Sequence, residues 1–544
     1  MASSAAPRIR RSLIDVQNDY DNGNKQELET LMRAWRGMKQ LPSGDLRSFF
    51  ILGGYHGEPF RGPGMTDPNY WGGYCEHGTV LFPSWHRAYL YVLEKALQSI
   101  PGCQSLMLPF WDECDPYSRS YGIPAALTWD TFVLDGETIP NPLKSFVLPE
   151  AIVDQVQGDN ALYSKPKGYE TVRYPLSGLV GTEADRKATE AHNAKFPDHA
   201  TNVKLLCQNV GDWLNGMAVV DGKPIGGNVY NRYISCLSAP TYTLFSNTTS
   251  AGAWNKANPN NLVVPLESPH NAMHLAVGGF DVPGQGDFSP IPGANGDMGE
   301  NDTAGLDPIF FFHHCFIDYA FWSWQKKHGA TSAPLAIDPK DPGSNSSTGT
   351  AQGPAAGTPP DTPLTATSPL NPFVMDDGTG KTRPITTNDV TDIRRLGYDY
   401  GFGSLDRFVD SSQALEGAAA EESGPTRTVY ISGIDRRKIR GSFVISAYAN
   451  IDGEVRPLGH EAVLSRWHVE GCLNCQSHLE ARTSFYVPET GEGGVPPVHV
   501  EVRTRQSILA SAAVGAGAGE GAAVEANALA AFAPAEPFLK VEIQ

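Results

Sequence analysis

The segment DPIFFFHHCFIDYAFWSW, residues 307–324, places two adjacent histidines inside a strongly apolar stretch. Asp307 and Pro308 are typical of a helix start, with the aspartate as N-cap and the proline in the first turn. His313 and His314 then point about 100° apart, so only one of them can share a metal with a given neighbouring helix. Aromatic residues surround the pair at Phe310, Phe311, Phe312, Phe316, Phe321, Trp322 and Trp324. Imidazoles in such surroundings need strong partners, because burying a polar group without one is costly.

The same helix carries a carboxylate near these histidines. Asp318 follows His314 by four residues and therefore lies on the same face, where it can orient an imidazole. The alternative is a polar patch at a helix N-terminus beneath an aromatic core.

A second segment, SPHNAMHLAVGG at residues 268–279, is expected to form a short helix. Ser268 is the expected N-cap, with Pro269 in the first turn and Gly278 just past the end. His270 and His274 then share one face at about 6 Å along the axis, a spacing that allows two imidazoles to bind one metal. Alone, this spacing is weak evidence for a metal site, and two core histidines are the alternative.

A third segment, CEHGTVLFPSWHRAYLYVLE at residues 75–94, contains His77 in a turn and His86 at the start of an amphipathic helix. For either residue alone, a hydrogen-bonded core histidine is the alternative. Sites made only of imidazoles favour copper, zinc, nickel or iron over calcium or magnesium. Two groups of histidines indicate two metals.

Composition excludes several classes of protein. The 544 residues include 60 acidic and 42 basic ones, a net charge of −18, which disfavours a nucleic-acid partner. We find no signal peptide and no run of about 18 apolar residues, so a cytoplasmic location is expected, with export by another route as the alternative. Eight cysteines are too few for a disulfide scaffold of this length, and Cys472 with Cys475 forms a CxxC pair.

The organisation changes along the chain. Residues 25–38 form an expected amphipathic helix, 120–265 read as loop-rich, and 331–372 as an irregular or mobile excursion. Residues 411–426 have the small, acidic composition of a linker, and strand patterns from 427 to about 508 predict a small β-sandwich. The Ala- and Gly-rich stretch 510–534 is expected to be flexible.

The histidine segments resemble the two copper signatures of tyrosinases. The first is His77-x4-Phe82-Pro83-x-Trp85-His86-Arg87 with Leu90 and Glu94, and the second is Asp307-Pro308-x-Phe310-x3-His314-x3-Asp318. Together with GYHGEPF around His56, they resemble the type 3 binuclear copper proteins. The closest resemblance is to latent fungal tyrosinases of the Aspergillus type and extends to about residue 490.

The resemblance implies a mainly α-helical catalytic domain, a bundle around a dicopper site, followed by a β-sandwich-like domain. The implied limits are a catalytic domain at 1–410 ending after Tyr398-Asp399-Tyr400, a cleavable linker at 411–426, and a shielding domain at 427–544. It also implies copper ligands at His56, His77 and His86 for one ion and His270, His274 and His314 for the other, with His313 in a supporting role.

Two cysteine features follow from the resemblance. Cys75 with His77 matches a Cys-x-His in which a thioether bond fixes the histidine, and a free buried cysteine is the alternative. Cys472 and Cys475, flanked by His468 and His478, match a copper-uptake site that a copper chaperone can serve. A small zinc site and a disulfide remain the alternatives there.

The implied activity is oxidation of monophenols and o-diphenols, such as tyrosine, DOPA and catechols, to o-quinones by O2, with melanin or other pigment as product. Glu267 and Asn271 match a pair that orients a water to deprotonate a monophenol, and ordinary helix-start chemistry is the alternative. A catechol or o-aminophenol oxidase and a haemocyanin-like oxygen carrier are the competing functions. A latent proenzyme and a homo-oligomer are further expectations.

Overall fold

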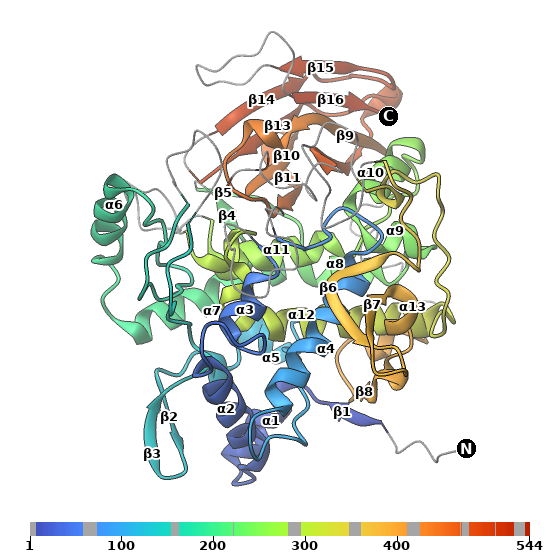
Figure 1. Cartoon of the computed structure of the whole chain (residues 1–544). Helices are drawn as coiled ribbons and strands as arrows, with labels where there is room; N and C mark the ends of the chain where they lie inside the picture. Colours follow the sequence, from blue (N-terminus) through green and yellow to red (C-terminus); the bar gives the residue numbers. More distant parts are fainter. Residues whose placement is uncertain are drawn as a thin grey trace.

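The computed structural model describes residues 7–57, 73–153, 163–220, 222–280, 295–346, 361–410, 425–467, 469, 478–505, 508–526 and 539–544. Its helices form the lower body of the molecule, and its last strands form a separate layer above them (Figure 1). The helices are α1 Leu13–Asp21, α2 Gln26–Lys39, α3 Phe49–Gly54, α4 Phe82–Gln98, α5 Pro116–Tyr121, α6 Glu183–Asn193, α7 His199–Asn215, α8 Val229–Cys236, α9 Tyr242–Ser246, α10 Thr248–Ala257, α11 Glu267–Gly278, α12 Ile309–Lys327 and α13 Thr387–Val390.

Helix α12 lies at the centre of the helical body. Every residue from Ile309 to Gln325 is buried, so this helix is enclosed on all sides and packs along α4. Helix α11 is also buried along its whole length, between α7 and α8. The two histidine-bearing helices therefore meet in the interior of one large hydrophobic core.

The starts of these helices differ from the expectation. Helix α11 begins at Glu267 with Leu266 as N-cap, because the Ser268 hydroxyl does not cap the helix and donates instead to Glu461, 193 residues away. Helix α12 begins at Ile309, and Pro308 is its N-cap. The Asp307 carboxylate still accepts from the Ile309 N–H at 3.1 Å, so, as expected, it satisfies a first-turn donor that has no partner within the helix.

The stretch 120–265, read from sequence as loop-rich, contains five helices, α6 to α10. Each has a side-chain cap at its start, from Thr182, Asp198, Asn228, Thr241 and Asn247. The polar residues that resembled loop composition are therefore helix caps. Helix α7 is also capped at its C-terminus by Gly216, whose φ of 74° is the left-handed conformation that glycine adopts readily.

In the described part of the chain, four short pairs of strands pack on the helical body. They are β1 Arg8–Arg10 with β8 Tyr398–Tyr400, β2 Thr131–Leu134 with β3 Glu137–Pro140, β4 Val219–Val220 with β5 Lys223–Pro224, and β6 Pro369–Asp376 with β7 Thr382–Thr386. The pairing of β1 with β8 joins the first described residues to the Tyr-x-Tyr segment.

The C-terminal strands form two antiparallel four-stranded sheets. They are β9 Thr426–Asp435, β10 Phe443–Ile451, β11 Glu454–Val463, β12 Glu480–Pro488, β13 Val498–Arg503, β14 Ile508–Val514, β15 Ala523–Ala526 and β16 Leu539–Ile543. The strand orders are β11-β10-β13-β14 and β12-β9-β16-β15, and a shared apolar core lies between the sheets. The expected fold class, a helical body with a C-terminal sheet domain, is confirmed.

The expectation of flexibility across 510–534 was wrong for its described part. Strand β14 extends into it as far as Val514 and β15 lies within it, and Ala510, Ala512 and Val514 are buried in the core of the sandwich. Alternating small residues fit the inner face of a sheet, so a composition that resembled low complexity is a strand pattern.

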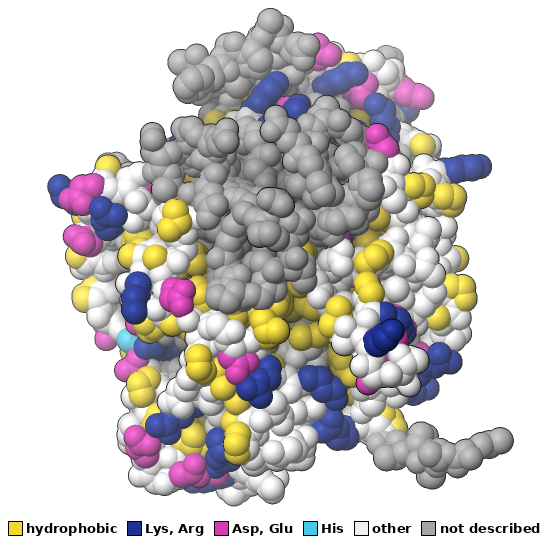
Figure 2. Space-filling view, viewed as in Figure 1, with side chains coloured by type: hydrophobic (Ala, Val, Ile, Leu, Met, Phe, Trp, Pro, Cys, Tyr) yellow, Lys and Arg dark blue, Asp and Glu magenta, His cyan; other side chains and the backbone are white. Residues whose placement is uncertain are grey.

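Surface charge agrees with the composition. Acidic and basic side chains are interspersed over the described part of the face in Figure 2, without a continuous basic stripe. Among the described residues, no helix has both the length and the apolar character needed to cross a membrane.

Candidate metal centre

Two groups of buried histidines meet between helices α4, α11 and α12. One group is His56, His77 and His86, and the other is His270, His274, His313 and His314. Within each group the ligand atoms all lie within 4.8 Å of one another. The six residues expected to bind metal are therefore brought together in two groups, and His313 joins the second.

The ring nitrogens of these residues have a common arrangement. The Nδ1 atoms of His56, His86, His274 and His314 face the carbonyl oxygens of Asn301, Phe82, Met298 and Phe310 at 2.7 to 3.2 Å. The Nδ1 of His270 faces the Asn271 Oδ1 at 2.9 Å. Because Nδ1 donates to these oxygens, the proton is held there and Nε2 keeps a free lone pair.

The Nε2 atoms converge. Those of His270 and His314 lie 3.0 Å apart, and those of His274 and His270 lie 3.1 Å apart. In the first group, the Nε2 atoms of His56, His77 and His86 are buried and have no hydrogen-bond partner within the described part of the chain. Burying a hydrogen-bond acceptor without a partner costs free energy. Three such nitrogens close together are suited to bind one metal ion.

Burial keeps these imidazoles neutral. It lowers the pKa of His86 to about 3 and of His274 to about 4, and it holds the pKa of the other five well below the usual value of a histidine. Neutral imidazole is the metal-binding form. The donor set, nitrogen alone in an apolar enclosure, fits copper well and fits Ca²⁺ or Mg²⁺ poorly.

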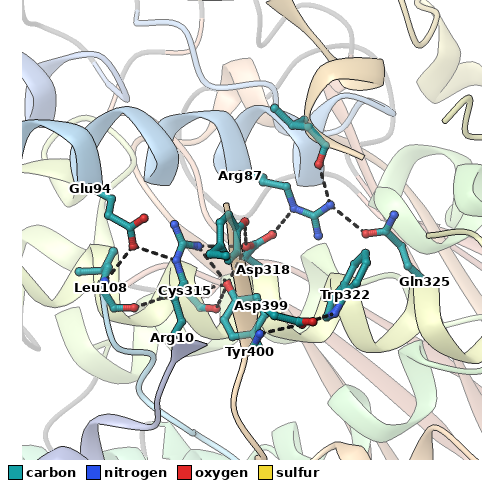
Figure 3. A network of polar contacts seen from close by, with 12 residues as sticks. Arg10, Arg87, Glu94, Leu108, Cys315, Asp318, Trp322, Gln325, Asp399 and Tyr400 are labelled. Atoms are coloured by element: carbon teal, nitrogen blue, oxygen red, sulfur yellow. Dashed lines mark hydrogen bonds and ion pairs between the residues drawn. The ribbon is translucent and has the colours of Figure 1, made fainter. Parts of the chain in front are cut away.

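Asp318 does not orient an imidazole, contrary to the expectation from its spacing. It accepts hydrogen bonds from Arg87, Arg10, Tyr398 and Tyr400 at 2.5 to 3.3 Å (Figure 3). The His314 Nδ1 uses the Phe310 carbonyl instead, one turn back in its own helix. Asp318 therefore belongs to a buried ion network that ties α4 and α12 to strands β1 and β8.

A carboxylate that the sequence did not reveal lies beside His313. The Glu113 Oε1 is 2.5 Å from the His313 Nδ1, and the Tyr233 hydroxyl donates to the Glu113 Oε2 at 2.6 Å. All three side chains are fully buried. Glu113 is 200 residues from His313 and lies in no recognisable motif, so no local pattern could have indicated it.

Glu267 and Asn271 both lie beside the histidines. The Glu267 Oε1 accepts from the N–H of Gly78, next to His77, and its Oε2 accepts from the Thr248 N–H and hydroxyl, all at 2.8 to 2.9 Å. Burial raises the pKa of Glu267, although these donors and Arg436 act in the opposite direction. Asn271 fixes the tautomer of His270, a role the sequence did not suggest.

The cysteines expected to act in copper chemistry divide between described and undescribed residues. Cys75 is buried, and its Sγ lies 3.4 Å from both the Asn301 Nδ2 and the Arg466 Nη2. Cys472, Cys475 and His468 lie outside the described residues. His478 is described, and its ring lies against Gly78 so closely that a Cβ there would overlap the imidazole.

Comparison with known proteins agrees with this geometry. Residues 46–327 match the family model described as the common central domain of tyrosinase. Over 506 residues the chain is 50% identical to the tyrosinase HcTyr2 of Hahella sp. (strain CCB-MM4), covering 89% of each protein. The chain belongs to the tyrosinase family.

Two further relatives extend the match over most of the chain. The tyrosinase of Aspergillus oryzae is 42% identical over 493 residues, 86% of this chain and 87% of the relative. A solved structure of a tyrosinase from Burkholderia thailandensis at low pH has a TM-score of 0.76 and 52% identity, covering 88% of this chain and 91% of that one. The expected resemblance to Aspergillus-type tyrosinases is confirmed.

Membership of this family makes the chain a type 3 copper oxidase of phenols, and the two histidine groups are where two copper ions fit. The buried Nε2 atoms of the first group and the converging ones of the second provide the nitrogen donors that such ions need.

Proposed function

We propose that this tyrosinase oxidises both monophenols and o-diphenols to o-quinones, and that its C-terminal sheets hold it latent. The observation that carries the proposal is the contact between those sheets and the segments that bear the histidines. Arg466, fully buried, places its Nη2 3.4 Å from the carbonyl oxygen of His56. His478 lies against Gly78, the residue after His77.

The second histidine group is covered in the same way. Arg505 donates to the carbonyl oxygen of Gly279, directly after α11, at 2.9 and 3.1 Å. It also pairs with the buried carboxylate of Glu300 at 2.5 Å. Loops of the C-terminal domain thus contact the segments that bear both groups, and strand β11 lies on α11 (Figure 1). A phenol can approach only when this layer moves or is cut away.

The residues around the site have separate tasks in the reaction. Copper, when bound, supplies the electron transfer between phenol and O2. The Nδ1 acceptors hold each imidazole with its Nε2 lone pair directed inward, and Asn271 does this for His270. The enclosing aromatic residues exclude water, so that neutral ligands and substrate meet in an apolar space.

Hydroxylation of a monophenol needs one further group, a base for the phenol proton. Glu267 is placed for it, because three donors occupy its oxygens and leave about one lone-pair position on a carboxylate that offers about four. Its pKa is raised by burial, which brings the carboxylate closer to the range useful for general base catalysis. We propose that it acts through a water on the side of Gly78.

Two comparisons test the function. Turnover of a catechol and of tyrosine is measured before and after proteolysis within residues 411–424, the part of the expected linker that lies outside the described residues. We expect a gain in both activities after cleavage, and no gain would refute latency. Reversible oxygenation without any phenol turnover, even after cleavage, would indicate the oxygen carrier.

Glu267→Gln separates the two phenol activities. We expect tyrosine hydroxylation to fall by about 10²–10⁴-fold, the usual contribution of a general base, while catechol oxidation is largely spared. The ratio of the two rates does not depend on how much of the variant folds. An equal loss of both would refute the role of Glu267, and a parent without hydroxylation would identify a catechol or aminophenol oxidase.

Copper supply stays a proposal that rests on the sequence. Cys472 and Cys475 are soft donors suited to Cu(I), so a copper chaperone is the proposed partner there. The homo-oligomer likewise stays a prediction. A melanin-type pigment is the proposed fate of the o-quinones.

A further inference from the structure

His313 is a seventh imidazole at the metal centre, beyond the six that the tyrosinase signatures account for. Its ring centroid lies 5.2 Å from that of His270, 5.0 Å from His274 and 4.8 Å from His314. The ligand atoms of all four fall within 4.8 Å of one another. The first group has three members among the described residues, so the two metal positions are unequal in the number of imidazoles they can use.

The surroundings of His313 match those of the metal ligands. As in five of the other six, an oxygen acceptor faces Nδ1 and directs the other ring nitrogen toward the site. For His313 this acceptor is a carboxylate, Glu113, which Tyr233 fixes in turn. A carboxylate on the far nitrogen of an imidazole is the arrangement that orients a metal-binding histidine and makes it a stronger donor.

The remaining nitrogen of His313 has no other use in the described structure. Its Nε2 is buried and has no hydrogen-bond partner among the described residues, as is also true of the Nε2 atoms of His56, His77 and His86. The buried His460, outside both groups, shares an Nε2 without a hydrogen-bond partner among the described residues, so this feature alone does not mark a metal ligand. What sets His313 apart is that its ligand atom lies within 4.8 Å of those of His270, His274 and His314.

The distances allow His313 to reach the second metal. Two nitrogens on one ion are at most about 4 Å apart, because metal–nitrogen bonds are about 2.0 Å long. The four ligand atoms lie within 4.8 Å of one another, so a shift of less than about 1 Å brings His313 into the coordination sphere. His313 and His314 are adjacent, with ring planes 83° apart, so both can approach one ion from different sides.

We propose that His313 is a reserve ligand of the second copper, which it binds through Nε2 when one of the other three imidazoles is lost or displaced. Glu113 and Tyr233 are positioning residues that hold it ready. The first copper has no such reserve within the described part of the chain. The second copper is therefore retained when one of its imidazole ligands is lost or displaced, whereas the same loss in the first group releases the first copper.

Copper content tests this proposal without reference to phenol turnover. The full chain is loaded with copper, and copper per chain and the rate of release to a Cu(I) chelator are measured for His86→Ala, His314→Ala and the double variant His313→Ala/His314→Ala. We expect the His86→Ala variant to lose the first copper. We expect the His314→Ala variant to keep the second copper. We expect the double variant to lose it.

Matched variants separate coordination from structure. In the His314→Ala background, Glu113→Gln should weaken copper retention by about 10–100-fold, the usual effect of removing an orienting partner. His192→Ala in the same background removes an equally buried histidine outside both groups and should change nothing. Copper loss from His314→Ala equal to that from the double variant would overturn the proposal, as would an equal effect of His192→Ala.

A single substitution covers the case in which the double variant does not fold. His313→Ala alone, with His314 intact, should speed copper release from the second position by about tenfold, the lower limit for losing such a partner. An unchanged release rate in a folded His313→Ala protein would overturn the proposal. These outcomes are distinct from a failure of the phenol oxidase function, because each is read from copper alone.

Discussion

Arg505 links the C-terminal domain to the residues that follow α11, the helix that carries His270 and His274. Its side chain is 5% exposed and pairs with Glu300, which is fully buried. It also donates to the carbonyl oxygens of Gly279 and Gly299 at 2.9 to 3.3 Å. Arg505→Ala removes every one of these bonds and leaves the Glu300 carboxylate with only the Ser442 N–H from the covering layer.

Breaking a buried ion pair by removing one partner costs about 3–5 kcal/mol. If about 3 kcal/mol of this acts on the docking of the sheets, the population with an open site rises by roughly 100-fold, since each 1.4 kcal/mol is about tenfold. We therefore expect the uncleaved Arg505→Ala variant to oxidise catechol up to about 100-fold faster than the uncleaved parent. Its rate cannot exceed that of the cleaved enzyme.

The assay is catechol turnover before and after cleavage, expressed as a ratio for each protein. Arg427→Ala is the control, because the ion pairs of Arg427 with Glu489 and Glu520 lie wholly within the C-terminal sheets. The control ratio should equal that of the parent. An Arg505→Ala protein that stays as latent as the parent would refute the reasoning, and so would a parallel loss of activity in its cleaved form.

Two further outcomes are expected from single substitutions. Asn271→Leu removes the acceptor for the His270 Nδ1–H and should lower copper affinity by about 10–100-fold in a chelator competition, whereas Asn271→Asp should retain it. The His499 hydrogen bond, followed by those of Lys223 and Arg503, lowers the pKa of Glu501 from 4.5, so Glu501 adds stability above pH 4.5 that is lost as pH falls through its folded pKa. Glu501→Gln should therefore lower the melting temperature at pH 7, and calorimetry should show the difference shrinking toward pH 3, whereas a constant difference would contradict this assignment.

Local motifs in the sequence indicated most histidines of the centre, whereas His56 was expected only from the resemblance to tyrosinases. His270 and His274 share a helix face, and His314 follows a helix-start signal within aromatic residues. The fold class was predictable for similar reasons, from long periodic segments and a change to strand patterns near residue 427. Local patterns specify helix faces and strands directly.

Features built from distant residues could not be predicted in this way. Glu113 meets His313 across 200 positions, and Asp318, correctly placed on the face of His314, is bound by arginines from two other segments. Helices α6 to α10 were missed because their caps resemble loop residues. Strand β14 was missed because alanine is a weak strand former that burial in a sandwich makes acceptable.

The most direct test of the central claim is copper content combined with electron paramagnetic resonance of the oxidised full-length protein. Two copper ions held side by side by the two histidine groups couple magnetically. The account predicts two coppers per chain, no signal from the Cu(II) pair, and strong near-ultraviolet absorption when the reduced protein meets O2. One copper per chain, or a signal that accounts for all the copper, would contradict it.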